Sequence, residues 1–342
     1  MTPNNNAQHP ADKKIKMKKI QVIILHRNSR QLLAAFVLLV LALSTVKATD
    51  FNFDKSFATP IEGRWDLTIT VEGKEFPSWL EVRHSGTNML VGQFVFITGS
   101  ARPVSRVNFK DGKMSFSVPP QWEPGNNDFL VEGTLQDDRL SGTVVTSDGK
   151  NYTWTGVRAP LLNKKMPLVW GKPIKLFNGT DLKGWHTMGE NQWIAEAGIL
   201  KNPKSGSNLI SDKTFSDFKL HIEFRYPKGS NSGIYLRGRY EVQVLDSKGM
   251  EPTSELFGGV YGFLTPNEMV AKDAGEWQTY DITLVGRMIT IVANGKTIIS
   301  NQAIPGITGG ALDSKEGEPG PILFQGDHGA VEFRNIILTP AK

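Results

Sequence analysis

Strict alternation of apolar and polar residues is the sequence feature that most limits how this chain can fold. In the run FKLHIEFRY (218–226), every second residue from Phe218 to Tyr226 is apolar, and the residues between them are polar. A period of two places the apolar side chains on one face of a strand. Residues 50–158 hold several shorter runs of this kind, with turn residues every eight to twelve positions and no sustained 3.6-residue period. The chain is therefore predicted to be all-β.

Residues 1–48 are predicted to be a signal peptide that is cleaved near Ala48. A basic stretch leads into an apolar run at 32–43, and Val46-Lys47-Ala48 follows at the positions of a cleavage site. The alternative is an uncleaved anchor, but this run is shorter than the ~20 residues that span a bilayer. The chain has no cysteine, so no lipid can be attached at a lipobox. The protein is predicted to be periplasmic or secreted, with no membrane attachment after signal removal.

The charge of the remaining chain argues against a nucleic-acid partner. Residues 1–48 hold eight Lys and Arg against one acid, so 31 basic and 33 acidic residues give 49–342 a net charge of −2. A nucleic-acid-binding domain usually carries a basic surface. The sequence also lacks a glycine-rich dinucleotide fingerprint.

Residues 49–158 are predicted to form a small antiparallel β-barrel or sandwich. Val71-Glu72-Gly73-Lys74 and Lys110-Asp111-Gly112-Lys113 are typical of hairpin turns, because Gly and Asp accept positive φ angles at low cost. Three of the four tryptophans of this domain could stack on sugars, although filling a small core is the more common role. These three are Trp79, Trp122 and Trp154.

Residues 159–172 contain two prolines and a lysine pair without a clean period, and we interpret them as a linker. Residues 173–342 are predicted to be a second domain of long antiparallel strands, with a type I′ hairpin at Asn294-Gly295. Strands of this length and pattern favour a jelly-roll sandwich of two curved sheets. One outer face of such a sandwich is often concave and can hold a sugar chain.

The run NSGIYLRGRYEVQVLDS (231–247) carries a polar face that a core does not explain. If the alternation continues through this run, one row on the sheet holds Arg237, Arg239, Glu241 and Gln243. Glu241 and Asp246 also resemble the outer carboxylates of the E-x-D-x-x-E strand of retaining glucanases. Here Gln243 replaces the central carboxylate, which makes that reaction less favourable.

Residues from about 172 to 342 resemble the 3-keto-disaccharide hydrolase domain family. The resemblance rests on six ordered blocks. They are LFNGTDLKGW (176–185), the run at 231–247, GGVYG (258–262), GEWQTYDI (275–282), Asn294-Gly295, and GPILFQ (320–325) continuing through His328-Gly329 to FRNI (333–336). The resemblance implies a concanavalin A-like jelly roll and action on glycosides whose C3 hydroxyl has been oxidised to a ketone.

That resemblance implies a reaction in which a base removes the C2 proton, the C1 substituent is eliminated and water adds back. Glu241 and His328 are predicted to be the catalytic acid–base groups. Arg237 is predicted to hold the developing oxyanion, and Gln243 a sugar hydroxyl. The other residues predicted to bind substrate are Arg239, Asp246, Tyr261, Trp277 and Gln325.

No cofactor is predicted. The four histidines after residue 48, at positions 84, 186, 221 and 328, lack metal-ligand spacing, although a divalent metal remains possible. The predicted partner is an oligosaccharide or glycoside substrate, and the oligomeric state stays open. Two alternatives to the 3-keto-glycoside enzyme remain, a non-catalytic carbohydrate-binding (lectin-like) protein and a retaining glucanase-type hydrolase.

Overall fold

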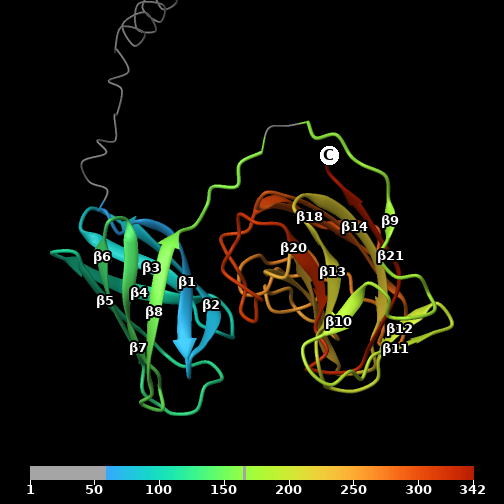
Figure 1. Cartoon of the computed structure of the whole chain (residues 1–342), viewed down its shortest axis with the longest axis horizontal. Helices are drawn as coiled ribbons and strands as arrows, with labels where there is room; N and C mark the ends of the chain where they lie inside the picture. Colours follow the sequence, from blue (N-terminus) through green and yellow to red (C-terminus); the bar gives the residue numbers. More distant parts are fainter. Residues whose placement is uncertain (1–58, 165–166) are drawn as a thin grey trace, which may run out of the picture. The chain divides into compact units, whose positions relative to one another are not determined.

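The computed structural model describes residues 59–164 and 167–342, and residues 59–342 form one compact unit. The predicted signal peptide and its cleavage near Ala48 lie outside the described residues. Within them the regular structure is entirely β, which confirms the predicted fold class (Figure 1). The same described part of the chain offers no helix of the length and apolarity needed to cross a membrane.

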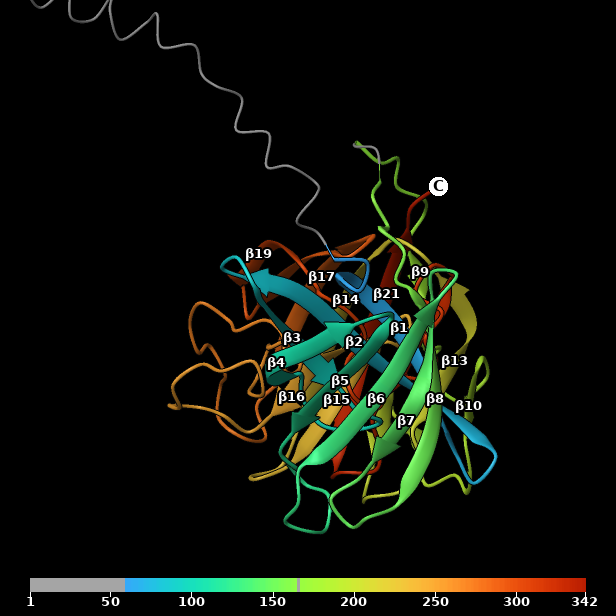
Figure 2. The same ribbon diagram turned by 90° about the vertical axis from the view of Figure 1, so that its left-hand side faces the viewer.

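The first eight strands form a closed antiparallel barrel, because β1 pairs with β2 on one side and with β8 on the other. Figure 2 shows β6, β7 and β8 side by side in this barrel. The strands are β1 Gly63–Val71, β2 Lys74–Ser85, β3 Met89–Val95, β4 Arg102–Lys110, β5 Lys113–Val118, β6 Phe129–Gln136, β7 Arg139–Val145 and β8 Asn151–Arg158.

Local sequence explains both the hairpins and the barrel core. The turn between β1 and β2 has φ values of 49° at Glu72 and 79° at Gly73, which confirms the predicted hairpin. The three tryptophans that could stack on sugars lie in different environments. Trp154 is buried in the barrel core, Trp79 is buried against the second domain, and Trp122 is exposed.

The rest of the chain forms two further antiparallel sheets, as predicted for a jelly-roll sandwich. One sheet has the order β10-β13-β20-β15-β16, and the other β11-β12-β21-β14-β17-β18-β19, with β9 paired to β21. The strands are β9 Ile174–Lys175, β10 Trp185–Thr187, β11 Ile194–Glu196, β12 Ile199–Asn202, β13 Leu209–Phe215, β14 Phe218–Arg225, β15 Asn231–Leu236, β16 Tyr240–Leu245, β17 Gln278–Val285, β18 Met288–Ala293, β19 Lys296–Ala303, β20 Gly320–Phe324 and β21 Val331–Pro340.

A single apolar core lies between these two sheets. The alternating residues of β14, including Phe218 and Phe224, are fully buried in it. Phe324 of one sheet stacks on Phe333 of the other, with ring centroids 4.3 Å apart. An aromatic pair of this kind adds about 0.5–1.5 kcal/mol beyond the burial of its area. The face of β16 opposite this core is therefore available for polar groups.

The polar run at 231–247 is a hairpin and not the continuous strand that its alternation suggests. β15 ends at Leu236, and φ is 54° at Arg237 and 66° at Gly238. Two successive positive φ angles reverse the chain tightly, and β16 returns antiparallel from Tyr240. The glycine after Arg237 permits this reversal. The reversal divides the predicted row of polar side chains.

Candidate active site

A cavity of about 690 Å³ lies against hairpin β15–β16. Glu241 and Gln243 from β16, and Tyr235 from β15, form part of its lining. Its other walls come from Asn208 before β13, from the segments after β16, β19 and β20, and from two loops of the barrel, which contribute Thr98-Gly99 and Trp122. Residues far apart in the sequence thus meet at one concave surface.

Glu241 is a buried carboxyl group in the lining of this cavity, and it is only 4% exposed. Its Oε2 lies 2.9 Å from the Tyr235 hydroxyl, which comes from the directly paired position of β15. The carboxyl group also lies over Gly233, where a Cβ atom would collide with it. The absence of a side chain at Gly233 therefore makes room for the carboxyl group.

Burial raises the pKa of Glu241 to about 8, against a smaller lowering by the hydrogen bond from Tyr235 and the charge of His328. The Tyr235 hydroxyl also lies 2.9 Å from the Gly309 carbonyl oxygen. A hydroxyl has one proton and cannot donate it to both acceptors at once. The carboxylate and the Gly309 carbonyl therefore compete for the Tyr235 proton, which weakens the effect of this hydrogen bond on Glu241. Burial is the larger effect and favours a neutral Glu241 at pH 7.

His328 and Asp327 form an ion pair at the same cavity. The Nδ1 atom of His328 lies 2.7 Å from Oδ1 of Asp327. This hydrogen bond raises the pKa of His328 above its ordinary value, with a further contribution from the charge of Glu241. Burial acts to raise the pKa of Asp327, but its bond to His328 outweighs burial and the pKa is lowered. Asp327 is therefore a charged partner that orients the imidazole and leaves Nε2 free of that bond.

Three buried side-chain oxygens at the cavity have no hydrogen-bond partner among the described residues. They are Oε1 of Gln243, Oε1 of Gln325 and Oδ1 of Asn231. The Gln243 amide is oriented by its Nε2, which donates to the Glu255 carbonyl at 3.2 Å, so its oxygen stays unpaired. An unpaired buried acceptor costs about 1–3 kcal/mol. Such acceptors are suited to the hydroxyl groups of a bound ligand.

Five of the nine predicted site residues line this cavity. They are Glu241, Gln243, Tyr261, Gln325 and His328. Tyr261 lies at the wall, and burial together with the charge of Glu241 raises its pKa to about 12, so its hydroxyl stays protonated at neutral pH. The predicted catalytic pair and three predicted substrate contacts are therefore close together.

Arg237 and Arg239 do not line this cavity. Their placement was predicted from the alternation, and the turn after β15 interrupts that alternation. Arg237 Nη2 donates to the Tyr240 hydroxyl at 3.0 Å and to the Gly286 carbonyl at 2.7 Å. Arg239 Nε pairs with Asp313 at 2.7 Å. Both guanidiniums are buried in contacts outside the cavity lining, so Arg237 is not placed to hold an oxyanion there.

Asp246 and Trp277 also lie outside the cavity lining. The Asp246 carboxylate accepts the Gly229 backbone N–H at 2.9 Å and closes a turn. Trp277, which precedes β17, lies under the guanidinium carbons of Arg225 and Arg334, at 4.8 and 3.8 Å from its ring centroid. Two cation–π contacts account for this tryptophan without a sugar.

The predicted site residues did not include Tyr235, Asn231 or Trp122, although Trp122 was one of the barrel tryptophans that could stack on sugars. Tyr235 could have been found from the pairing across the hairpin, because it faces Glu241 directly. No sequence signal connects Trp122 with residues more than a hundred positions away, since only the tertiary structure brings the barrel loop to the cavity.

In residues 59–164 and 167–342, no group of three or more His, Asp or Glu side chains is arranged to hold a metal ion. Asp327 and His328 bond to each other instead of converging on a common point. The side chains as arranged do not fit a metal, and the chelator experiment below tests whether a divalent ion takes part.

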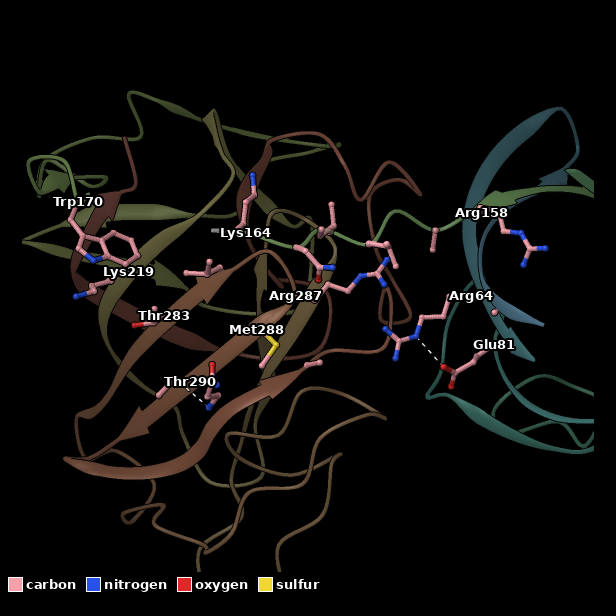
Figure 3. A pocket seen from close by; sticks show the side chains of 18 residues that line it. Arg64, Glu81, Arg158, Lys164, Trp170, Lys219, Thr283, Arg287, Met288 and Thr290 are labelled. Atoms are coloured by element: carbon pink, nitrogen blue, oxygen red, sulfur yellow. Dashed lines mark hydrogen bonds and ion pairs between the residues drawn. The ribbon is translucent and has the colours of Figure 1, made fainter. Parts of the chain in front are cut away.

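A larger cavity, of about 1150 Å³, includes several basic side chains in its lining (Figure 3). Arg64 pairs with Glu81 at 3.0 Å, and Arg287 pairs with the buried Glu316. These arginines are already neutralised by acidic partners. The cavity at hairpin β15–β16 is the better candidate active site, because acid–base groups and unpaired acceptors meet there.

Comparison with known proteins relates the second domain to one family. Residues 172–339 match the family model described as a 3-keto-alpha-glucoside-1,2-lyase-like domain, which confirms the predicted resemblance. A curated Bacteroides thetaiotaomicron protein named 3-keto-disaccharide hydrolase is 27% identical over 129 residues. That match covers 34% of this chain and 42% of the relative's length. The segment that supplies Glu241, Gln243 and His328 is therefore similar to this family.

Solved structures also resemble part of this chain. A Parabacteroides distasonis protein, provisionally named a glycosyl hydrolase, is 27% identical with a TM-score of 0.43, over 52% of this chain and 92% of that one. The carbohydrate binding module CBM66 from Bacillus subtilis is 13% identical with a TM-score of 0.33, over 46% of this chain and 95% of the module.

Proposed function

We propose that this chain is an exported enzyme that cleaves 3-keto-glycosides by elimination and rehydration. The observation that carries the proposal is the pairing, in one cavity, of a buried Glu241 whose pKa is raised to about 8 with an imidazole held by Asp327. Perturbed acid–base groups that share a cleft are typical of an active site. The family match over residues 172–339 supplies the substrate class.

The chemistry requires one base and one acid. A ketone at C3 makes the C2 proton acidic, so a base can remove it and leave an enolate on the C3 oxygen. The enolate then re-forms the ketone as the C1=C2 double bond forms and the C1–O bond breaks, and the leaving oxygen takes a proton. Water adds its oxygen to C1 and a proton to C2, which regenerates the 3-keto sugar. The net reaction is hydrolysis.

We assign the base role to His328 and the acid role to Glu241. Asp327 holds Nδ1 of His328, and Nε2 is the nitrogen that can take the C2 proton. Glu241 keeps its proton up to about pH 8 and can give it to the leaving-group oxygen. Activity should therefore rise as His328 loses its proton and fall as Glu241 ionises, giving a bell-shaped pH profile.

The remaining cavity groups suit the sugar itself. The unpaired oxygens of Gln243, Gln325 and Asn231 can accept hydrogen bonds from sugar hydroxyls. Tyr261, which stays protonated at neutral pH, can donate to the enolate oxygen in place of the predicted Arg237. These contacts would hold the sugar with C2 and C1 near the acid–base pair.

The test compares a p-nitrophenyl 3-keto-α-glucoside with its unoxidised counterpart, before and after treatment with a chelator. The purified chain should release p-nitrophenol from the keto substrate alone, and the Glu241→Gln variant should lose about 10²-fold or more of kcat. Sensitivity to the chelator would add a metal to the mechanism. Release from neither substrate would refute the proposal.

A non-catalytic carbohydrate-binding protein is the second candidate, and the unpaired acceptors favour it equally. Calorimetric binding of a glycan, largely unchanged in Glu241→Gln and without turnover of any 3-keto glycoside, would establish it. The retaining-glucanase alternative is weaker, because Asp246, its second carboxylate, lies outside the cavity lining. Release of p-nitrophenol from the unoxidised substrate would favour the retaining-glucanase alternative.

A further inference from the structure

Trp122 is the most exposed of the large apolar residues that line the candidate active site, and it comes from the barrel. It lies on the loop between β5 and β6, and 75% of its surface is exposed. Yet it belongs to the same cavity lining as Glu241 and His328. Its position in a lining that also holds convergent polar groups is what suits it to a ligand, because binding sites combine aromatic rings with a few placed polar groups.

The buried side chain of Arg102 anchors the loop that carries Trp122. Arg102 is 2% exposed, and its Nη2 pairs with Glu123 at 3.2 Å while its Nη1 donates to the Pro119 carbonyl at 3.0 Å. The guanidinium also lies 4.8 Å from the ring centroid of Phe129. The residues on both sides of Trp122 are thus fixed, and the indole is held in place by a preorganised loop.

A second anchor connects this loop to the cavity wall. The Gln121 side chain donates to the Ser100 hydroxyl at 2.7 Å and accepts the Ser100 backbone N–H at 3.0 Å. Three residues before Ser100, the Ile97 carbonyl accepts the Gly310 N–H at 3.0 Å. Gly310 itself lines the cavity, next to the Gly309 carbonyl that Tyr235 contacts. The loop is therefore attached to the wall that holds the acid.

We propose that Trp122 is an aromatic platform for a second sugar ring, the one that leaves when a 3-keto disaccharide is cleaved. The inference rests on the proposed function. The acid–base groups and the unpaired acceptors belong to the sandwich and suit the oxidised sugar. The barrel adds a flat apolar ring, which suits the C–H face of a pyranose. The first domain is thus a specificity element that favours disaccharides over simple glycosides.

The test compares Trp122→Ala with the unaltered chain on two substrates, a 3-keto disaccharide of two glucose units and methyl 3-keto-α-glucoside. The variant should raise KM for the disaccharide about tenfold, leave its kcat within twofold, and leave KM for the methyl glycoside unchanged. Trp122→Phe should recover most of the disaccharide affinity. Leu130→Ala removes an exposed apolar residue of the barrel outside this cavity lining and should change neither substrate's KM.

Equal effects on both substrates, or no effect on either, would overturn the platform. If the unaltered chain cleaves neither substrate, the proposed function fails, and the platform is tested by binding alone. Calorimetric titration should then show that maltose binds more tightly than methyl α-glucoside, and that Trp122→Ala abolishes the difference. Equal affinities for the two sugars in the unaltered chain would overturn the platform independently of catalysis.

Discussion

Tyr235→Phe is the substitution that most directly tests how the cavity sets the protonation of Glu241. It removes one hydroxyl group that lies 2.9 Å from both the Glu241 carboxyl and the Gly309 carbonyl. The phenyl ring remains, and the position is 3% exposed, so packing is retained. The change therefore isolates the hydrogen bond from the burial of the carboxyl group.

The expected magnitude follows from the role of that hydrogen bond. A hydrogen bond to a charged group contributes about 1.5–3 kcal/mol, and one pKa unit corresponds to about 1.4 kcal/mol. The Gly309 carbonyl competes for the same proton, so only the lower part of this range acts on Glu241. The pKa of Glu241 should rise by about one pH unit from its value of about 8. The unpaired Gly309 carbonyl should lower the free energy of unfolding by about 1–3 kcal/mol.

The assay is the pH dependence of kcat/KM, with ¹³C-NMR titration of the Glu241 carboxyl carbon as a readout that needs no turnover. The alkaline limb and the NMR titration should both move to higher pH. Tyr280→Phe is the matched control, because this buried tyrosine donates a 2.8 Å hydrogen bond to the Gln243 carbonyl. It should show a similar loss in urea denaturation without moving the titration of Glu241.

An unchanged or lowered pKa in Tyr235→Phe would refute the reasoning, because the hydroxyl would then not be a donor to the carboxylate. A shift of the same size in Tyr280→Phe would also count against it. General loosening of the domain, and not the specific hydrogen bond, would then explain the change.

Three further changes test other parts of the structure. Gly233→Ala should lower kcat at least about tenfold, since its methyl group would collide with the Glu241 carboxyl, and steady-state kinetics measures this. Asp327→Asn should lower the pKa of His328 and move the acid limb of kcat/KM to lower pH, because the Asp327 bond is what raises that pKa. Burial and a second buried carboxyl raise the pKa of Asp66 far above its ordinary value. The stabilisation from its protonated form is present at low pH and is lost as pH rises through the raised pKa, by up to about 1.4 kcal/mol per pH unit. Asp66→Asn should remove this slope in urea denaturation between pH 6 and pH 9, and an unchanged slope would contradict the assignment.

Much of the fold could be predicted because strands and turns depend on residues that are close together in the sequence. Alternation in β14 fixes which side chains face the core, and Glu72-Gly73 and Asn294-Gly295 fix two hairpins through their positive φ angles. The same local logic failed at Arg237-Gly238, where alternation was followed through a turn. A side-chain period of two carries no information on whether the strand continues or the chain reverses at a permissive glycine.

The candidate site was predictable only in part. Glu241, Gln243 and His328 lie in sequence blocks typical of one family, and the structure brings them to one cavity. Arg237 and Arg239 were placed there by period alone, but each guanidinium found buried partners elsewhere. Partner choice for a long charged side chain depends on the groups around it in space, and the sequence does not show these groups.

Local sequence patterns predicted an all-β chain and the resemblance of its second domain, and both predictions are confirmed. They also singled out Glu241 and His328 as candidate acid–base groups. Only long-range packing buries Glu241 against Tyr235 and brings the barrel residue Trp122 to the same cavity. The two kinds of feature depend on contacts of different sequence separation. Strand patterns and turns depend on neighbours in sequence, whereas burial, pKa and cavity lining depend on residues that only long-range packing brings together.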